Sequence, residues 1–367
     1  MTFARPEYTR GEVQRAGALL ARTPDEEQAP VERTQALAVV NNWRAAHAYP
    51  LNTFQATLRD KLRRLGVDAV VGERLKRLPS ILGKLQRQPN MNLQQMQDIA
   101  GLRAVVHDAR AISTIRENYE ASRFQHELRG VDDYIADPKI DGYRSLHLKY
   151  RYRSSNASAY NGLHVELQIR TKLQHVWATA VETVDTFMQQ AIKAGRPQAG
   201  WGEFFALASA YFAHEEGRAP PSAYSGVSRR AIMEALYDAE RALGVRARLR
   251  GYTVAADQIH TTGRAAAAWH VVVLNTAERR LNTYSFSDSE QSRVNALYAY
   301  YETRAAAGES LDTVVVRGGD VRSLRTAYPN YFLDATAFLV KLDRLCIEVG
   351  RWRTRVRLRQ ALDSDDD

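Results

Sequence analysis

Four short segments between residues 72 and 171 concentrate the side chains that phosphate chemistry requires. The first segment, residues 72–87, holds Arg74, Lys76 and Lys84. Such cations can bind a polyphosphate through charge-assisted hydrogen bonds. A solvated basic helix face has the same composition, so this segment alone does not separate the two interpretations.

Two other segments supply carboxylates. Asp98 opens the stretch DIAGLR (residues 98–103), just before a glycine and an apolar run that predicts a buried strand. A carboxylate at a strand edge can hold Mg²⁺, and a helix cap or surface carboxylate is the alternative. Glu166 lies in HVELQIRT (residues 164–171), which alternates apolar and polar residues as a half-buried strand does. The polar face of that strand is either solvated or the floor of an active site.

The remaining segment, residues 131–147, reads as a loop because it contains Pro138 and Gly142. An aromatic ring on a glycine-hinged loop can stack on a nucleobase, and a packed structural tyrosine is the alternative. The side chains around this loop with possible binding roles are Lys139, Tyr143, Arg144 and His147.

Taken together and in this order, the four segments resemble the synthetase domain of the RelA/SpoT family. The shared patterns are R-x-K-x(3)-S-I-x(2)-K from Arg74, D-I-x-G-x-R from Asp98, D-Y-I-x(2)-P-K-x(2)-G-Y-x-S-L-H from Asp133, and E-x-Q-I-R-T from Glu166. The resemblance covers roughly residues 50–195. It implies a mixed α+β fold, with a central mixed sheet flanked by helices as in nucleotidyltransferase-like RelA/SpoT synthetases. We expect a second, smaller α+β domain beside it.

The resemblance also implies an activity, the transfer of the β,γ-pyrophosphate of ATP to a 3′-hydroxyl with Mg²⁺ as cofactor. On the ATP side, Arg74 would stack on the adenine, Lys76 and Lys84 would contact the phosphates, and Arg103 would assist. Asp98 would hold the metal, and Glu166 would be either a second metal ligand or the general base. The acceptor side would comprise Tyr143, stacked on the acceptor base, with Arg144, His147, Gln168 and Arg170. Transfer of this kind depends on positioning and charge neutralisation, which these residue types provide.

The acceptor is left open by these motifs. Small synthetases of this family use either GDP or GTP, which gives the alarmone (p)ppGpp, or the 3′-CCA end of tRNA, which blocks translation. Residues 145–153 alternate as a strand, so Lys149, Arg151 and Arg153 share one face, where they would hold a tRNA backbone. A solvated strand face is the alternative. We expect tRNA as the acceptor; alarmone synthesis and a non-catalytic nucleotide- or RNA-binding module are the rival interpretations.

The C-terminal half contains a Y-x-x-Y motif, Tyr328-Pro-Asn-Tyr331. A synthetase followed by a domain with this motif resembles the CapRel group of single-chain toxin–antitoxin defence proteins. The resemblance implies that the C-terminal domain is an antitoxin whose two tyrosines cover the ATP site. It also implies that a phage structural protein, such as the capsid protein, releases the enzyme. The alternative is that both tyrosines pack at the start of a helix.

The sequence divides into five expected parts. They are a helical region (1–50), the synthetase (51–212), a Pro- and Gly-containing linker (213–227), the regulatory domain (228–350) and a basic then acidic tail (351–367). The apolar pattern of residues 31–48 predicts a helix that stops at Tyr49-Pro50. Five arginines at alternate positions between Arg351 and Arg359 predict a two-faced edge strand or a solvated basic arm.

Composition sets the broad class. The 367 residues include 51 Lys and Arg against 42 Asp and Glu, a formal net charge of +9, and 43 of the basic residues are Arg. Arginine suits phosphate partners, although a GC-rich genome produces the same bias. A single cysteine, Cys346, excludes an intramolecular disulfide and a cysteine-based zinc site. We see neither a run of ~18 apolar residues nor a secretory apolar core, and we expect a cytoplasmic protein without a membrane partner.

Overall fold

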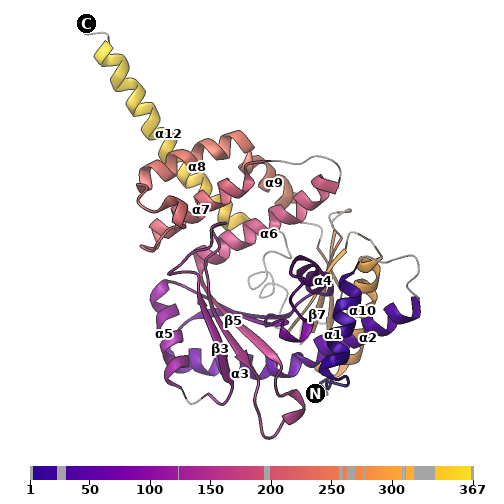
Figure 1. Cartoon of the computed structure of the whole chain (residues 1–367). Coiled ribbons are helices and arrows are strands. Elements are labelled where there is room, and N and C mark those ends of the chain that lie inside the picture. The colour runs from indigo at the N-terminus through magenta and orange to yellow at the C-terminus, as the bar shows by residue number, and fades with distance from the viewer. Residues whose placement is uncertain are drawn as a thin grey trace. The chain divides into compact units, whose positions relative to one another are not determined.

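The computed structural model describes residues 3–22, 30–122, 124–193, 199–255, 259–262, 269–275, 278, 280–307, 309, 311–317 and 335–364. The chain divides into two compact units, each built from several stretches of sequence (Figure 1). Unit 1 comprises Met1–Asp132, Leu146–Thr171 and Gln258–Tyr328. Unit 2 comprises Asp133–Ser145, Lys172–Asp257 and Pro329–Asp367.

Unit 1 contains a five-stranded sheet. Its strands are β1 (Ala69–Leu75), β2 (Ala100–Val106), β3 (Glu127–Asp133), β4 (Leu146–Arg151) and β5 (His164–Thr171), in the order β1-β2-β5-β4-β3. The β2–β5 pair is parallel, whereas β1–β2 and β4–β5 are antiparallel. The prediction of a mixed sheet flanked by helices is therefore confirmed.

One face of this sheet is apolar. Leu148 of β4, Leu102 of β2 and Leu167 of β5 are fully buried on it. Helices α3 (Ala48–Leu65) and α5 (Ala109–Ala121) pack against β2 and β5, α3 through Phe54 and Leu58 (Figure 1). This arrangement leaves the opposite face of the central strands for polar side chains.

Helices α1 (Arg10–Ala21), α2 (Pro30–Ala46) and α4 (Leu78–Arg87) complete the N-terminal part of unit 1. The predicted helix over residues 31–48 corresponds to α2. The predicted stop at Tyr49-Pro50 is wrong, because α3 begins at Ala48 and includes both residues. Pro50 lies in the first turn of α3, where a missing backbone N–H costs no intrahelical hydrogen bond.

A second, four-stranded sheet also belongs to unit 1. It comprises β6 (Ile259–Thr262), β7 (Trp269–Asn275), β8 (Arg280–Phe286) and β9 (Leu311–Arg317), in the order β6-β8-β7-β9. Strands β7 and β8 pair antiparallel. Helix α10 (Gln291–Ala306) packs on β7 and β9, and β9 lies beside β1. We call residues 259–317 the sheet lobe.

Unit 2 is helical. Its described residues form helices α6 (Lys172–Lys193), α7 (Trp201–Glu215), α8 (Arg229–Leu243), α9 (Val245–Ala255) and α12 (Thr336–Ser364). They share one core around Phe204, Ile232 and Phe338, so residues before and after the predicted linker 213–227 pack in the same unit. This division differs from the predicted boundary between residues 51–212 and 228–350. The short 3₁₀ helices of the chain are Leu93–Gln95, Ser158–Tyr160, Ser222–Tyr224 and Asp288–Glu290.

The arginine-rich tail corrects another expectation. Residues 351–364 form the end of α12 rather than an edge strand or an irregular arm (Figure 1). The apolar residues Phe338, Leu342, Leu345 and Val349 recur at helical spacing and bury one face of α12, which then continues through the arginines. Among the described residues, none of the helices combines the length and apolar character needed to cross a membrane.

Two buried histidines lie at the edge of the apolar core of unit 1. His47, which precedes α3, and His164, the first residue of β5, are both more than nine-tenths buried. Burial lowers the pKa of His47 to about 3. Burial and the charges of neighbouring arginines lower the pKa of His164 to about 4. Both rings are therefore neutral in the folded protein at pH 5–7.

Lowering the pH from 7 to 5 is expected to cost unit 1 about 2 kcal/mol of unfolding free energy per buried histidine. In the unfolded chain these histidines have pKa values near 6.5 and bind protons, whereas in the folded chain they stay neutral. The free energy of unfolding therefore falls as the pH drops below about 7. Urea unfolding at pH 5, 6 and 7 measures the slope. Replacing His47 with Asn and His164 with Gln should flatten it, while His107→Asn, at an exposed site, should not. An unchanged slope in the double variant would contradict this assignment.

Candidate active site

The polar face of the five-stranded sheet brings the sequence motifs together. Strand register places the residues in two neighbouring rows across the sheet. Side chains alternate along each strand, so both rows lie on the same face. The first row is Arg74, Gly101, Glu166 and Lys149; the second is Gly72, Arg103, Gln168 and His147.

A cavity with about 340 Å³ of empty space, part of it open to solvent, lies over these rows. Two glycines of these rows, Gly72 and Gly101, line the bottom of the cavity with backbone alone. Sequence reasoning did not single out Gly72, although a glycine in a strand often marks a close approach by a ligand. The residues that line the cavity are Gly72, Arg74, Asp98, Gly101, Leu102, Arg103, Glu166 and Gln168.

Asp98 lies at the centre of a cation cluster beside this cavity. Lys76 Nζ donates to Asp98 Oδ2 at 2.7 Å, and Lys84 Nζ donates to Oδ1 at 3.0 Å. Burial alone would raise the pKa of Asp98, but the charges and hydrogen bonds of the two lysines outweigh it and hold the pKa at about 2. Asp98 is therefore ionised, and it holds both lysines beside the cavity.

Glu166 is buried and bonded to two neighbours in its own sheet. His147 Nδ1 lies 3.0 Å from Glu166 Oε1, and Gln168 Nε2 donates to Oε2 at 2.7 Å. Arg170 donates in turn to Gln168 Oε1 at 3.0 Å. Burial and the charge of Asp98 raise the pKa of Glu166, but the bonds from His147 and Gln168 prevail and leave it lowered. A carboxylate with a lowered pKa suits a metal ligand better than a general base at neutral pH.

The donor set fits Mg²⁺ held together with a nucleotide. Asp98 and Glu166 line the same cavity, and their carboxylate oxygens are the hard donors that Mg²⁺ prefers. Among the described residues, no group of three or more His, Cys, Asp or Glu gathers around one point. Mg²⁺ usually takes only one or two carboxylates and completes its shell with phosphate oxygens and water. The two carboxylates would thus need a bound triphosphate to complete the site.

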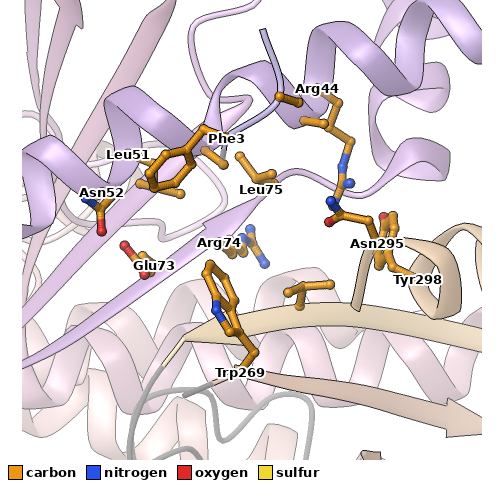
Figure 2. A pocket seen from close by; sticks show the side chains of 14 residues that line it. Phe3, Arg44, Leu51, Asn52, Glu73, Arg74, Leu75, Trp269, Asn295 and Tyr298 are labelled. Atoms are coloured by element: carbon orange, nitrogen blue, oxygen red, sulfur yellow. The ribbon is translucent and has the colours of Figure 1, made fainter. Parts of the chain in front are cut away.

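Arg74 also lines a second cavity, on the side of the sheet lobe, with about 720 Å³ of empty space that is partly open (Figure 2). Figure 2 shows Arg74 beside Trp269 of β7, with Arg44 reaching toward Asn295 and Tyr298 of α10. The predicted adenine-stacking arginine therefore shares a cavity with residues of the sheet lobe. Sequence reasoning missed Trp269, Tyr298 and Arg44, because no local pattern links such distant positions.

Tyr143 lies in unit 2, on the loop that residues 133–145 form. Its ring packs 5.8 Å from Tyr134 and 6.4 Å from Trp177, between centroids, and Lys139 Nζ lies 5.2 Å from its centroid. Gly142, at φ +94°, leaves no room for a Cβ, which would stand 2.8 Å from Ser209 Cβ. The loop is therefore fixed by close packing against α7.

Arg144 forms its ion pair and hydrogen bonds with other residues of unit 2. Its side chain is 2% exposed, and Nη1 donates to Glu216 Oε2 at 2.6 Å while Nε donates to Ser209 Oγ at 3.2 Å. Gln174 Nε2 donates to the same Glu216 oxygen at 3.3 Å. This geometry gives Arg144 the role of fastening the Tyr143 loop to α7, rather than presenting a free cation to the predicted acceptor.

The three basic residues predicted to contact RNA follow β4 and its C-terminal end. Lys149 pairs with Asp132 at 2.5 Å, and Arg151 and Arg153 both pair with Glu127, at 3.9 and 3.2 Å. The side chain of Arg153 is 53% exposed, and the other two are about one-quarter exposed. The predicted cover of the ATP site, Tyr328 and Tyr331, lies outside the described residues.

Comparison with known proteins places the four motifs in one family region. Residues 73–186 match the family model described as "Region found in RelA / SpoT proteins". The chain is 38% identical over 117 residues to GTP pyrophosphokinase YjbM of Bacillus subtilis (strain 168), which covers 31% of this chain and 54% of that protein. It is 28% identical over 151 residues to the GTP pyrophosphokinase of Escherichia coli (strain K12), covering 40% and 18%. The chain thus spans about half of the first relative and under one-fifth of the second.

Among solved structures, small alarmone synthetase 1 from Bacillus subtilis bound to its product pppGpp aligns with 26% identity and a TM-score of 0.39. That alignment covers 46% of this chain and 88% of the other. The predicted RelA/SpoT synthetase region is confirmed by the family match. The match stops at residue 186, so it does not reach the sheet lobe or most of unit 2.

Proposed function

We propose that this protein is an ATP-dependent pyrophosphokinase that transfers the β,γ-pyrophosphate of ATP to a 3′-hydroxyl. The observation that carries the proposal is the single cavity in which Asp98, Glu166, Arg74 and Arg103 meet, inside the matched RelA/SpoT region. The two relatives described above bear the name GTP pyrophosphokinase. Two lysines bonded to Asp98 provide the positive charge that a triphosphate requires.

Each residue would act through charge or position. Lys76 and Lys84 would release Asp98 and donate their hydrogen bonds to the ATP phosphates instead. Arg74 would stack on the adenine. Asp98 and Glu166 would hold Mg²⁺, which neutralises phosphate charge when it is bound. His147 and Gln168 orient the Glu166 carboxylate, since both bond to it in the folded chain. Tyr143 would stack on the acceptor base and thereby present its hydroxyl.

For the acceptor, we propose the 3′ end of tRNA, on the basis of the excess positive charge of the chain and the basic residues along β4. The second candidate is GDP or GTP, which the names of the relatives favour. A third possibility is a nucleotide- or RNA-binding module without catalysis. The two carboxylates Asp98 and Glu166, which line one cavity, argue against it, because a module that only binds phosphate does not need them.

The acceptor assay decides among these functions. The purified full chain is incubated with Mg²⁺ and γ-³²P-ATP, together with deacylated tRNA or with GDP. Label in tRNA supports the proposed acceptor, and label in a guanosine nucleotide supports alarmone synthesis. Label in neither, also with candidate phage proteins present, refutes the pyrophosphokinase proposal.

We further propose that the C-terminal part inhibits the enzyme and that a phage structural protein relieves the inhibition, as in toxin–antitoxin defence. The cavity that Arg74 shares with Trp269 supports this, because it places the sheet lobe next to the arginine proposed to stack on the adenine. A trigger activates only if it binds the open form better than the closed form. The trigger should therefore recognise the C-terminal part and leave a chain without it unchanged.

Charge reversal along β4 tests the RNA contact. Replacing Arg151 and Arg153 with Glu should reduce tRNA modification most strongly at low salt and make its salt dependence shallower, because each lost phosphate contact removes part of the salt dependence of binding. Glu127, their shared partner, provides the matched control: Glu127→Gln frees both arginines and should leave binding equal or stronger. Modification rates in 50–300 mM KCl check this, and an unchanged salt slope in the reversed variant would contradict the contact.

A further inference from the structure

One buried carboxylate outside the candidate active site joins the sheet lobe to the N-terminal part of unit 1. This carboxylate belongs to Glu302 on α10, a residue that is only 3% exposed. Burial raises the pKa of Glu302, while Arg44, the Tyr298 hydroxyl, Arg77 and the backbone N–H of Leu78 oppose that rise. Within the described part of the chain, Glu302 Oε2 has no hydrogen-bond partner. A buried carboxylate is costly unless it is paired, so Glu302 depends on the cations around it.

Arg44 connects this carboxylate to two elements at once. Its Nε donates to the carbonyl oxygen of Lys76 at 2.7 Å, and its guanidinium carbon lies 4.0 Å from the centre of the Tyr298 ring. Arg44 is 6% exposed, and a desolvated cation is attracted to the face of an aromatic ring. Figure 2 shows the Arg44 side chain extending from α2 toward α10.

Helix α4 lacks a cap of its own that would satisfy its first N–H groups. It begins at Leu78, and among the described residues its N-cap, Arg77, makes no side-chain capping bond. Unsatisfied N–H groups and the helix dipole favour an anion at this end. The buried acid Glu302 belongs to α10, which contacts α4, and it lies one helical turn after Tyr298, the ring that Arg44 covers.

The same short segment carries the two lysines of the candidate active site. Lys76 has its carbonyl bound by Arg44 and its ammonium bound by Asp98, and Lys84 lies on α4 itself. We propose that Glu302, with Arg44 and Tyr298, is a lock that fastens the sheet lobe to the start of α4. Breaking this lock would free the sheet lobe and loosen the segment from Lys76 to Lys84 in one event. Its regulatory meaning rests on the proposed function; the lock itself does not.

Hydrogen exchange tests the lock without any assay of catalysis. In the full chain, Glu302→Gln removes the charge at nearly constant size and should speed amide exchange in the first turns of α4 and in β9 at least about tenfold. Glu309→Gln is the matched control, because Glu309 follows α10 and forms an exposed ion pair with Arg304. We expect the control to exchange as the unaltered protein does.

Arg44→Gln provides the second arm. It should speed exchange in the same two regions, and the double variant with Glu302→Gln should be no faster than the faster single variant, since both act on one contact. Additive effects, an unchanged rate in Glu302→Gln, or faster exchange in α4 without β9 would overturn the lock. Circular dichroism confirms that each variant is folded. A chain that labels neither acceptor refutes the proposed function, while these exchange rates still decide the lock.

Discussion

Glu166→Gln is expected to lower pyrophosphate transfer by about 10²–10³-fold, the range found when one group that stabilises developing charge is removed. The amide keeps the size of the side chain, but it removes the negative charge from a cavity that also contains Asp98. With Glu166 neutral, Asp98 would be the remaining predicted carboxylate for Mg²⁺. The rate is measured with saturating ATP across a Mg²⁺ titration.

The matched control for this substitution is Glu127→Gln, on β3 of the same sheet and outside the cavity lining. It should transfer pyrophosphate at the normal rate, provided that thermal unfolding shows both variants folded. If Glu166→Gln retained full activity at every Mg²⁺ concentration, the active site would have to lie elsewhere. If both variants lost activity equally, the effect would be on folding rather than on the site.

Removing the sheet lobe should have the opposite effect. We expect a chain in which residues 258–328 are replaced by a short Gly-Ser linker to transfer pyrophosphate faster and to be toxic on expression. If the closed form outweighs the open form about 100-fold, a difference of about 2.7 kcal/mol, the deletion raises transfer by up to about 100-fold. Adding Glu166→Gln to the deletion should abolish the toxicity, because the toxicity would come from catalysis.

The extent of the deletion affects what the experiment tests. A truncation from about residue 220 would remove α8, α9 and α12, which share their core with α6 and α7, and would expose that core. Because deleting the sheet lobe also takes Glu302 away from α4, Trp269→Ala in the full chain is the narrower variant. Tyr328→Ala with Tyr331→Ala is a second narrow variant. A folded deletion chain no more active than the full chain would contradict autoinhibition.

Local patterns in the sequence predicted the sheet well. Alternation along residues 145–153 and 164–170 predicted the strands that became β4 and β5, and it placed Glu166 and Gln168 on a polar face. The parallel pairing of β2 with β5, which brings Gly101 opposite Glu166, was not predicted. A period of two fixes which face a residue occupies, but it does not fix which strand lies beside it.

The non-local contacts were not predictable in this way. Arg44, Tyr298 and Glu302 come together only because the sheet lobe docks beside β1, and no spacing rule connects α2 to α10. The prediction for the arginine-rich tail was wrong for a different reason. Arginines at alternate positions from Arg351 suggested a strand. The helical period of the apolar residues from Phe338 to Val349 was the stronger signal, and the helix continues past it.

The discontinuity of the two units bears on how this chain is made by the ribosome. Phe338 and Leu342 of α12 fill the core on which α6 and α7 pack, so unit 2 is incomplete until α12 has emerged from the ribosome. The Tyr143 loop packs on α7 through Gly142 and Ser209, and it therefore waits for the same event. A nascent chain would hold all five central strands long before the Tyr143 loop is set. The acceptor contact proposed for Tyr143 would therefore form only after α12 has packed on α6 and α7.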